Sequence, residues 1–282
     1  MMKTFANAIA VVTGAGSGIG RAVACEFASR GCDLALADID EAGLAQTRAA
    51  LPGNRRVTTS RVDVAALADM TRLRDEVARD FGRVSVLVNN AGVALYGRFE
   101  DLSVADLQWI MGINFWGAVY GCQLFLPLLL REPAANIVTL SSLFGIVAPP
   151  MQIGYSASKF AVRGFSEALR HELAPTTVRV TVVHPGGIRT NIAKTTRRGE
   201  GADEARFARD TKKFDAALTM PPPKAAKLIA EAILRDRARL LIGNDAHAVD
   251  AIVRAFPALY MKVLQPVFDP KKRFVAGKSA DR

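Results

Sequence analysis

The amino-acid sequence predicts an α/β protein whose parallel sheet is covered by helices on both faces. Short apolar runs, which suit buried strands, alternate with helical patterns along much of the chain. The first run, Ala8 to Val12, leads through a glycine-rich turn into a helical pattern. Repeated strand-helix units of this length are typical of a parallel sheet. At 282 residues the chain has room for one large domain or two small ones.

Composition is that of an ordinary globular protein. Half of the residues are hydrophobic and 23% are charged. The nearest candidate for a membrane-spanning run, Leu124 to Leu130, is too short and is broken by Pro127. Met1 to Val12 lacks the length and the cleavage site of a signal peptide. We therefore expect neither a spanning helix nor a secretory signal.

Cysteine usage and the distribution of basic residues restrict the compartment and the partners. Cys25, Cys32 and Cys122 have no CxxC spacing, so we expect no disulfide framework, no metal site and a reducing, cytoplasmic environment. The net charge is +10, but most lysines and arginines are dispersed. Basic pairs such as Lys212-Lys213 are not interleaved with aromatic residues. We therefore expect no nucleic-acid partner.

A glycine-rich turn follows the first predicted strand. The glycines that suit a turn, Gly14, Gly18 and Gly20, have the spacing G-x-x-x-G-x-G. The strict G-x-G-x-x-G fingerprint fails because position 19 is Ile. A strand, a glycine turn and a helix in this order leave helix N-terminal amides open for a pyrophosphate. A plain strand-to-helix corner is the alternative.

An acidic residue ends the second predicted strand. The apolar run Leu34 to Ala37 stops at Asp38, about 20 residues past the glycines, where a carboxylate can accept both ribose hydroxyls of an adenosine and repel a 2′-phosphate. Ser17 and Ile39 are not basic, so no nearby arginine or lysine is offered to a 2′-phosphate. Helix capping falls more naturally to Asp40. NAD is favoured, with NADP as the alternative.

The alternation continues to a fourth strand. A strand near Val57 to Val62 is followed by Asp63-Val64, a helix from about Ala66 to Phe81, and a strand at Val84 to Val88. Asp63 contacts an adenine or caps the helix, and we hold both roles open. After the fourth strand, Asn89-Asn90-Ala91-Gly92 lets the backbone approach a ligand at the carboxyl edge of the sheet, or forms a simple turn.

Later segments bring further polar residues toward that edge. A helical stretch from Ser103 to about Leu130 contains Asn114. Three roles are open for its amide: it holds a water, it perturbs the local backbone, or it is bonded within the protein. A fifth strand, Ile137 to Leu140, ends in Ser141-Ser142. A sixth strand begins at Val178 and runs into His184-Pro185-Gly186-Gly187-Ile188-Arg189-Thr190.

A helix that begins after Gly154 carries a phenol and an ammonium on one face. Tyr155 and Lys159 are four residues apart, and the apolar residues that follow have helical spacing. A close cation favours the phenolate of a tyrosine, whose ordinary pKa is about 10, and brings it toward use as an acid or base. With Ser142 thirteen residues ahead, the pair predicts a proton-transfer site.

The motifs follow one another in the order Thr13-Gly14-x-x-x-Gly18-x-Gly20, Asp38, Asp63, Asn89-Asn90-Ala91-Gly92, Asn114, Ser142, Tyr155-x-x-x-Lys159 and Pro185-Gly186. In this order they resemble the short-chain dehydrogenase/reductase family over about Ile9 to Thr190. The resemblance implies a Rossmann-type doubly wound, three-layer α/β/α fold with a parallel sheet of about seven strands. We expect the last strand at Leu240 to Ile242, after a helix opened by Pro221-Pro222-Pro223.

The resemblance also implies residue roles. Tyr155 would be the general acid or base, and Ser142, with Ser141 as the fallback, would hydrogen-bond the substrate oxygen. Lys159 would bind the nicotinamide ribose and lower the pKa of Tyr155, and Asn114 would hold the water of a proton relay. No catalytic role falls to His171, His184 or His247. The implied cofactor contacts are Gly14, Ser17, Gly18, Ile19, Gly20, Asp38, Asp63, Val64, Asn90, Ala91, Gly92, Tyr155, Lys159, Pro185, Gly186, Ile188 and Thr190.

Two predicted walls of the substrate site are largely apolar. Val93 to Phe99 and Leu143 to Ile153 contribute Leu95, Tyr96, Leu143, Phe144, Ile146, Val147, Met151 and Ile153. They favour an NAD-dependent oxidoreductase that interconverts a hydrophobic secondary alcohol and its ketone. A peripheral-membrane lipid, steroid or retinoid dehydrogenase and a non-catalytic dinucleotide-sensing regulator are the alternatives. The family resemblance suggests a homodimer or homotetramer through the long helices.

The C-terminal part extends beyond the resemblance. We expect one domain over residues 1–245, with a substrate lid near 190–220, and a helical extension with a basic tail over residues 246–282. The charged stretch Lys194 to Lys213 resembles a mobile lid, and we expect weak order there without cofactor. Two roles are open for residues Ala246 to Phe268. They form an amphipathic helix on an anionic membrane, or they pack on the domain edge or a neighbouring subunit. We favour packing.

Overall fold

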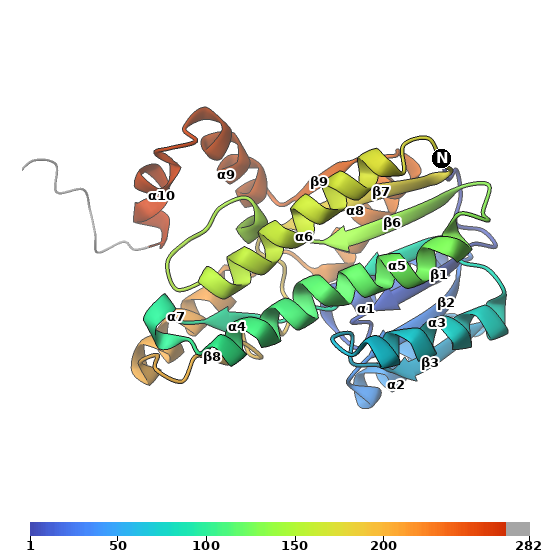
Figure 1. Cartoon of the computed structure of the whole chain (residues 1–282), viewed down its shortest axis with the longest axis horizontal. Helices are drawn as coiled ribbons and strands as arrows, with labels where there is room; N and C mark the ends of the chain where they lie inside the picture. The colour runs from blue at the N-terminus through green and yellow to red at the C-terminus, as the bar shows by residue number, and fades with distance from the viewer. Residues whose placement is uncertain (269–282) are drawn as a thin grey trace, which may run out of the picture.

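The computed structural model describes residues 1–268 and has a seven-stranded parallel sheet at its centre (Figure 1). The strand order is β3-β2-β1-β4-β6-β7-β9, and every neighbouring pair is parallel. The apolar runs form these strands because both faces of the sheet are covered. The strands are β1 (Ile9–Thr13), β2 (Asp33–Asp38), β3 (Val57–Arg61), β4 (Val86–Asn89), β6 (Ala135–Leu140), β7 (Val178–Pro185) and β9 (Arg239–Ile242).

Helices cover both faces of the sheet and complete the predicted three layers. On one face α1 (Gly18–Ser29), α2 (Glu41–Ala49) and α8 (Pro222–Leu234) contribute to one hydrophobic core, with Phe27 fully buried. On the other face α3 (Leu67–Phe81), α5 (Gly117–Leu129) and α6 (Ile153–Glu172) contribute to the second core. In Figure 1, α5 and α6 cross in front of the sheet.

The strand order reverses at β1 and so creates a crevice. The chain moves outward from β1 to β2 and β3, then returns to place β4 on the other side of β1. Ligands of open α/β sheets bind outside the carboxyl ends of the strands at such a point. The predicted glycine turn follows β1, and the segment Asn90 to Gly92 follows β4, so both lie at this crevice.

Smaller elements lie beyond the carboxyl ends of the strands, on the left in Figure 1. Leu95–Tyr96 (β5) pairs in parallel with Arg197–Arg198 (β8), and the 3-10 turns η1 (Phe99–Asp101) and η3 (Leu143–Gly145) follow β5 and β6. The predicted lid forms β8 and α7 (Glu204–Ala217); its expected weak order without cofactor stays a prediction. The C-terminal helices are α9 (Asn244–Ala255) and α10 (Tyr260–Phe268).

The helical stretch expected from Ser103 to about Leu130 contains a π-helical turn. Val104–Leu129 joins α4 (Val104–Met111), the π-helical turn η2 (Gly112–Trp116) and α5, and by length and composition alone it could cross a membrane. A core helix passes the same test. Phe125 and Leu129 of this stretch are fully buried in the core beside the sheet, so its apolar character serves packing.

Candidate active site

The glycine turn is packed against the segment after β4. Gly14 has a φ of +65°, and a Cβ there would lie 2.7 Å from the Asn90 side-chain nitrogen. A Cβ on Gly20 would run into the Gly14 carbonyl. Asn90 Nδ2 donates to the carbonyls of Thr13 at 2.9 Å and Gly14 at 3.0 Å. Neighbouring atoms leave no room for a Cβ at either position, so both residues must be glycine. The bare backbone of the turn forms a cradle of the kind that binds a pyrophosphate.

Asp38 borders the same turn from the end of β2. Its carboxylate accepts hydrogen bonds from the amides of Gly16 at 2.8 Å and Asp40 at 3.0 Å. An arginine lies nearer than the sequence suggested, because Arg21 donates to the Gly16 carbonyl from behind the turn. Its guanidinium also donates to Thr47 Oγ1, to the Gly43 carbonyl and to Gln46. Arg21 is therefore engaged inside the protein and does not line the cavity.

A cavity of about 1640 Å³ runs outward from this turn. Gly20 and Asn114 are the two residues of the predicted site that do not line it. Asp63 lines the cavity and accepts from the Ala65 amide at 2.9 Å, but it does not cap α3, whose N-cap is Ala66; the adenine contact of Asp63 stays a prediction. The predicted residues that line the cavity are Gly14, Ser17, Gly18, Ile19, Asp38, Asp63, Val64, Asn90, Ala91, Gly92, Ser142, Tyr155, Lys159, Pro185, Gly186, Ile188 and Thr190.

The proton-transfer groups meet at the carboxyl edge of the sheet. Tyr155 and Lys159 extend from α6, are 7% and 4% exposed, and share the cavity with Ser142. Burial raises the pKa of Tyr155 above its ordinary value, and a hydrogen bond with the Ser142 side chain opposes that rise. The Lys159 ammonium lies 5.8 Å from the centre of the Tyr155 ring and donates to the Leu140 carbonyl at 2.9 Å. Burial lowers the pKa of Lys159 to about 8.

Asn114 connects the π-helical turn to the catalytic helix. Its Oδ1 accepts from the Val93 amide at 2.8 Å, and its Nδ2 donates to the Val93 carbonyl at 3.0 Å and to Ser158 Oγ at 2.9 Å. The side chain is thus internally bonded, and the helix around it is perturbed, as two of the sequence readings allowed. The water-relay role of Asn114 stays a prediction.

The wall facing the substrate end combines predicted and unpredicted residues. Tyr96, Leu143, Phe144 and Met151 line the cavity, whereas the equally apolar Val147 packs with α9 and α10 in a separate core. Leu95, Ile146 and Ile153 are also outside the lining. The predicted lid contributes Arg206, Arg209, Asp210, Thr211, Lys213, Phe214 and Ala217 of α7 to the lining. The lining residues of α9 and α10, which sequence reasoning missed, are Asp245, Val249, Met261, Lys262 and Gln265.

Asp245, which the sequence analysis did not identify, holds the turn after β7 in place. It lies in the first turn of α9 and accepts from the Gly187 amide at 2.7 Å. That contact fixes the turn after β7, which carries Gly186, Ile188 and Thr190 along the cavity. Only the fold brings a residue 58 positions away to this turn, so no local pattern could have identified it.

Comparisons with known proteins agree with this geometry. Residues 8–201 match the family model for short chain dehydrogenases, which is well over half of the chain. The chain belongs to the short-chain dehydrogenase/reductase family. A "Putative oxidoreductase SadH" from Mycobacterium tuberculosis is 41% identical over 267 residues, which cover 93% of this chain and 96% of the relative. A Lactiplantibacillus plantarum "CLA biosynthesis dehydrogenase/reductase" is 34% identical over 198 residues, 69% of each chain.

Solved structures agree with the fold. A Burkholderia phymatum short chain dehydrogenase/reductase in complex with NAD has a TM-score of 0.83 and 33% identity, and the match covers 92% of this chain and 96% of that one. A Streptomyces avermitilis short-chain dehydrogenase has a TM-score of 0.80 and 27% identity, over 95% of this chain and all of that one. The chain is thus an oxidoreductase of a family that binds NAD or NADP and acts on CH-OH groups.

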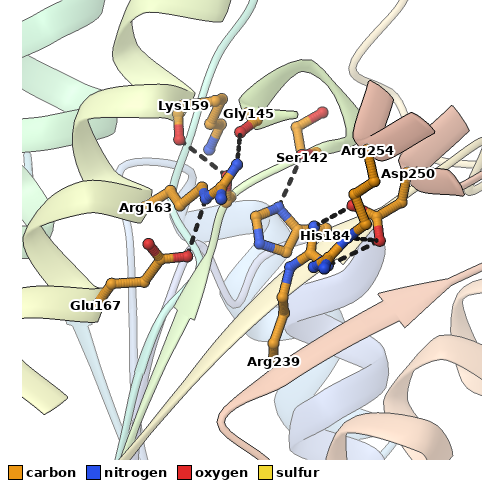
Figure 2. A network of polar contacts seen from close by, with 10 residues as sticks. Ser142, Gly145, Lys159, Arg163, Glu167, His184, Arg239, Asp250 and Arg254 are labelled. Atoms are coloured by element: carbon orange, nitrogen blue, oxygen red, sulfur yellow. Dashed lines mark hydrogen bonds and ion pairs between the residues drawn. The ribbon is translucent and has the colours of Figure 1, made fainter. Parts of the chain in front are cut away.

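In this short-chain dehydrogenase a polar network holds the turn that carries Ser142 (Figure 2). His184 of β7 is fully buried, and its Nδ1 donates to the Ser142 carbonyl at 3.1 Å. Arg163 of α6 donates to the Gly145 carbonyl at 3.2 Å and pairs with Glu167 at 2.9 Å. Figure 2 shows His184 between the Ser142 turn and Arg239, whose guanidinium pairs with Asp250 of α9 at 2.6 Å.

We expect His184 to make the folded state sensitive to acid. Burial, reinforced by Arg239 and Arg163 and opposed by the Ser142 carbonyl and Glu167, lowers the pKa of His184 from 6.5 to about 4. The unfolded chain therefore binds the proton first. The stabilisation is complete above pH 6.5 and declines as the pH falls toward 4, by about 2 kcal/mol at pH 5.

Urea unfolding at pH 7.5 and pH 5 would measure this effect. His184→Asn keeps a donor for the Ser142 carbonyl and removes the imidazole, so it should lose less stability between the two pH values than the wild type. His171→Asn, at an exposed position near the end of α6, is the matched control and should behave as the wild type does. Equal pH dependence in His184→Asn and the wild type would contradict the assignment.

Proposed function

We propose that this chain is an NAD-dependent dehydrogenase that interconverts a hydrophobic secondary alcohol and its ketone. The observation that carries the proposal is the meeting of Tyr155, Lys159 and Ser142 in a cavity that also contains the glycine cradle. Apolar side chains such as Leu143 and Met151 lie on the substrate side of these groups. A polyol or sugar would leave its hydroxyls unpaired against such a wall.

The residues along the cavity fit a dinucleotide. The cradle at Gly14 and Gly18 suits the pyrophosphate, and the turn from Gly186 to Thr190 lies toward the nicotinamide end. Asp38 keeps free lone pairs beside its two amide contacts and can accept the ribose hydroxyls, whereas a 2′-phosphate would meet its negative charge. Since Arg21 is engaged elsewhere, we infer a preference for NAD over NADP.

The bound nicotinamide supplies the hydride acceptor or donor. Tyr155 takes the hydroxyl proton in oxidation and returns it in reduction. Ser142 holds the substrate oxygen beside Tyr155, since its hydroxyl already reaches the phenol. Lys159 places a positive charge 5.8 Å from the centre of the Tyr155 ring, and this charge stabilises the phenolate that forms.

Hydride transfer can be measured directly. The protein is mixed with NAD or NADP and a panel of secondary alcohols that runs from apolar to sugar-like, and the formation of reduced cofactor is followed by absorbance. We expect turnover with NAD and with apolar alcohols. Tight NAD binding without turnover on any alcohol or ketone would favour the dinucleotide-sensing alternative.

We further propose a homodimer or homotetramer formed through α5 and α6. An aromatic group links η2 to these helices: Phe115 of η2 contacts Trp116 and Phe165 at ring distances of 5.5 and 6.1 Å, and Trp116 contacts Tyr120 of α5 at 5.8 Å. Trp116 is 46% exposed, which is costly for an isolated molecule and typical of an interface. Sedimentation equilibrium should give a dimer or tetramer, and Trp116→Glu should shift it to monomer. A monomeric wild type would refute this.

A further inference from the structure

The substrate end of the cavity is lined by cations from two helices. Arg206, Arg209 and Lys213 are spaced three and four residues apart, so they share one face of α7. Lys262 of α10 lines the same cavity. Figure 1 shows α7 and α10 apart from each other beyond the carboxyl ends of the strands. We call these four residues the cationic mouth.

Most of this positive charge is not neutralised within the protein. Asp210 is the carboxylate between the cations on α7, and its Oδ2 lies 3.5 Å from Arg206 and accepts from the Tyr96 hydroxyl at 2.7 Å. Over the described part of the chain, Arg209, Lys213 and Lys262 form no ion pair. The mouth therefore presents a net positive potential to whatever enters the cavity.

An apolar path connects the proton-transfer groups to the mouth. The Tyr155 ring contacts the Phe144 ring at 6.0 Å, edge to face, and Phe144 stacks on Phe214 at 6.4 Å. Phe214 directly follows Lys213 on α7. Two ring-to-ring steps therefore separate the reacting end from the cations. A ligand that reaches both must have an apolar body of several carbon atoms.

We propose that the cationic mouth binds an anionic end group of the substrate, a carboxylate or a phosphate ester. The substrate class is then an elongated hydrophobic alcohol or ketone whose reacting carbon lies at Tyr155 and whose charged end lies between α7 and α10. This inference rests on the proposed function, because it assumes that the substrate reacts at Tyr155. Arg206 is half-buried and Arg209, Lys213 and Lys262 are exposed, so their attractions for one anion add together and are screened by salt.

Matched substrates test the proposal. A secondary hydroxy fatty acid of medium length and its methyl ester have the same body and differ in end-group charge. We expect kcat/KM with NAD to be about tenfold higher for the acid at low salt, and this preference to shrink with added salt. Arg209→Gln combined with Lys213→Gln should bring the acid-to-ester ratio close to one. Lys212→Gln, which removes the neighbouring charge outside the cavity lining, should keep the wild-type ratio.

Binding measurements separate this inference from the proposed function. Calorimetry of the NAD-loaded protein with dodecanoate and with dodecanol does not depend on turnover; we expect tighter binding of the anion, lost in the double variant. Equal binding of both probes overturns the inference even if alcohols are oxidised. If the preference appears only with anionic phosphatidylglycerol vesicles and not with dissolved dodecanoate, the charge serves a membrane surface and the subsite is refuted. An equal loss in Lys212→Gln also refutes it.

Discussion

Tyr155→Phe should lower kcat about 1000-fold while NAD binding changes little. The substitution removes one oxygen atom and keeps the ring that contacts Phe144 at 6.0 Å, so the cavity wall stays in place. Without the hydroxyl no side chain at this position can take the substrate proton, and general acid-base catalysis is commonly worth about 100- to 10,000-fold in rate. Steady-state kinetics with the best alcohol of the panel, together with calorimetric NAD titration, would measure both quantities.

The matched control is Tyr120→Phe, which removes a phenol from α5 that does not line the cavity. It should keep kcat within about twofold of the wild type. A Tyr155→Phe variant that retains more than a tenth of the wild-type kcat would contradict the role of Tyr155. A second signature is the pH profile: because burial raises the pKa of Tyr155, the oxidation rate should rise with pH as the phenolate forms.

Asp38→Ala should lower the ratio of kcat/KM for NAD to that for NADP by about 100-fold. Two effects act in the same direction. The ribose hydroxyls lose hydrogen bonds to a charged acceptor, each worth about 1.5–3 kcal/mol, and the 2′-phosphate no longer meets a carboxylate. Since about 1.4 kcal/mol is tenfold, even the lower estimates give two orders of magnitude. Initial rates with each cofactor at a fixed alcohol concentration would give the ratio.

Asp33→Ala is the control for that experiment. Asp33 lies at the other end of β2 and accepts from the Arg56 amide at 3.1 Å, so its loss removes the same charge from the same strand without reaching the cavity. The cofactor ratio should then stay at the wild-type value. A wild type that uses NADP as well as NAD, or an unchanged ratio in Asp38→Ala, would show that Asp38 does not select the cofactor.

Residues whose role depends on neighbours in sequence could be predicted. The glycine turn, Asp38 and the Tyr155-Lys159 pair each lie directly at the end of a strand or on one helix face, so a short pattern determines where they lie. Strand bounds shifted slightly, as when the predicted Val84 to Val88 became Val86–Asn89. The seven-stranded sheet, including its last strand, agrees with the expectation from the family resemblance.

Residues whose role depends on tertiary packing could not be predicted. Asp245 reaches Gly187 only because α9 returns to the end of β7, and Lys262 reaches the cavity only through the packing of α10 on Val147. The stretch Val104–Leu129 illustrates the same limit, since its apolar composition alone does not tell a membrane from a core. Within the predicted extension, α9 and α10 pack on Val147 of the main domain, and the membrane alternative stays a prediction. The basic tail beyond Phe268 lies outside the described residues.

The cofactor end and the substrate end of the cavity differ in how many substitutions they can tolerate. Around Gly14 and Gly20, main-chain atoms fill the space, so almost any added side chain would be rejected. Along α7 and α10, most of the lining residues have long side chains, and several of them are exposed to water. Substitutions in these two surface helices could therefore change the substrate that the enzyme accepts without altering the part of the cavity that suits a dinucleotide.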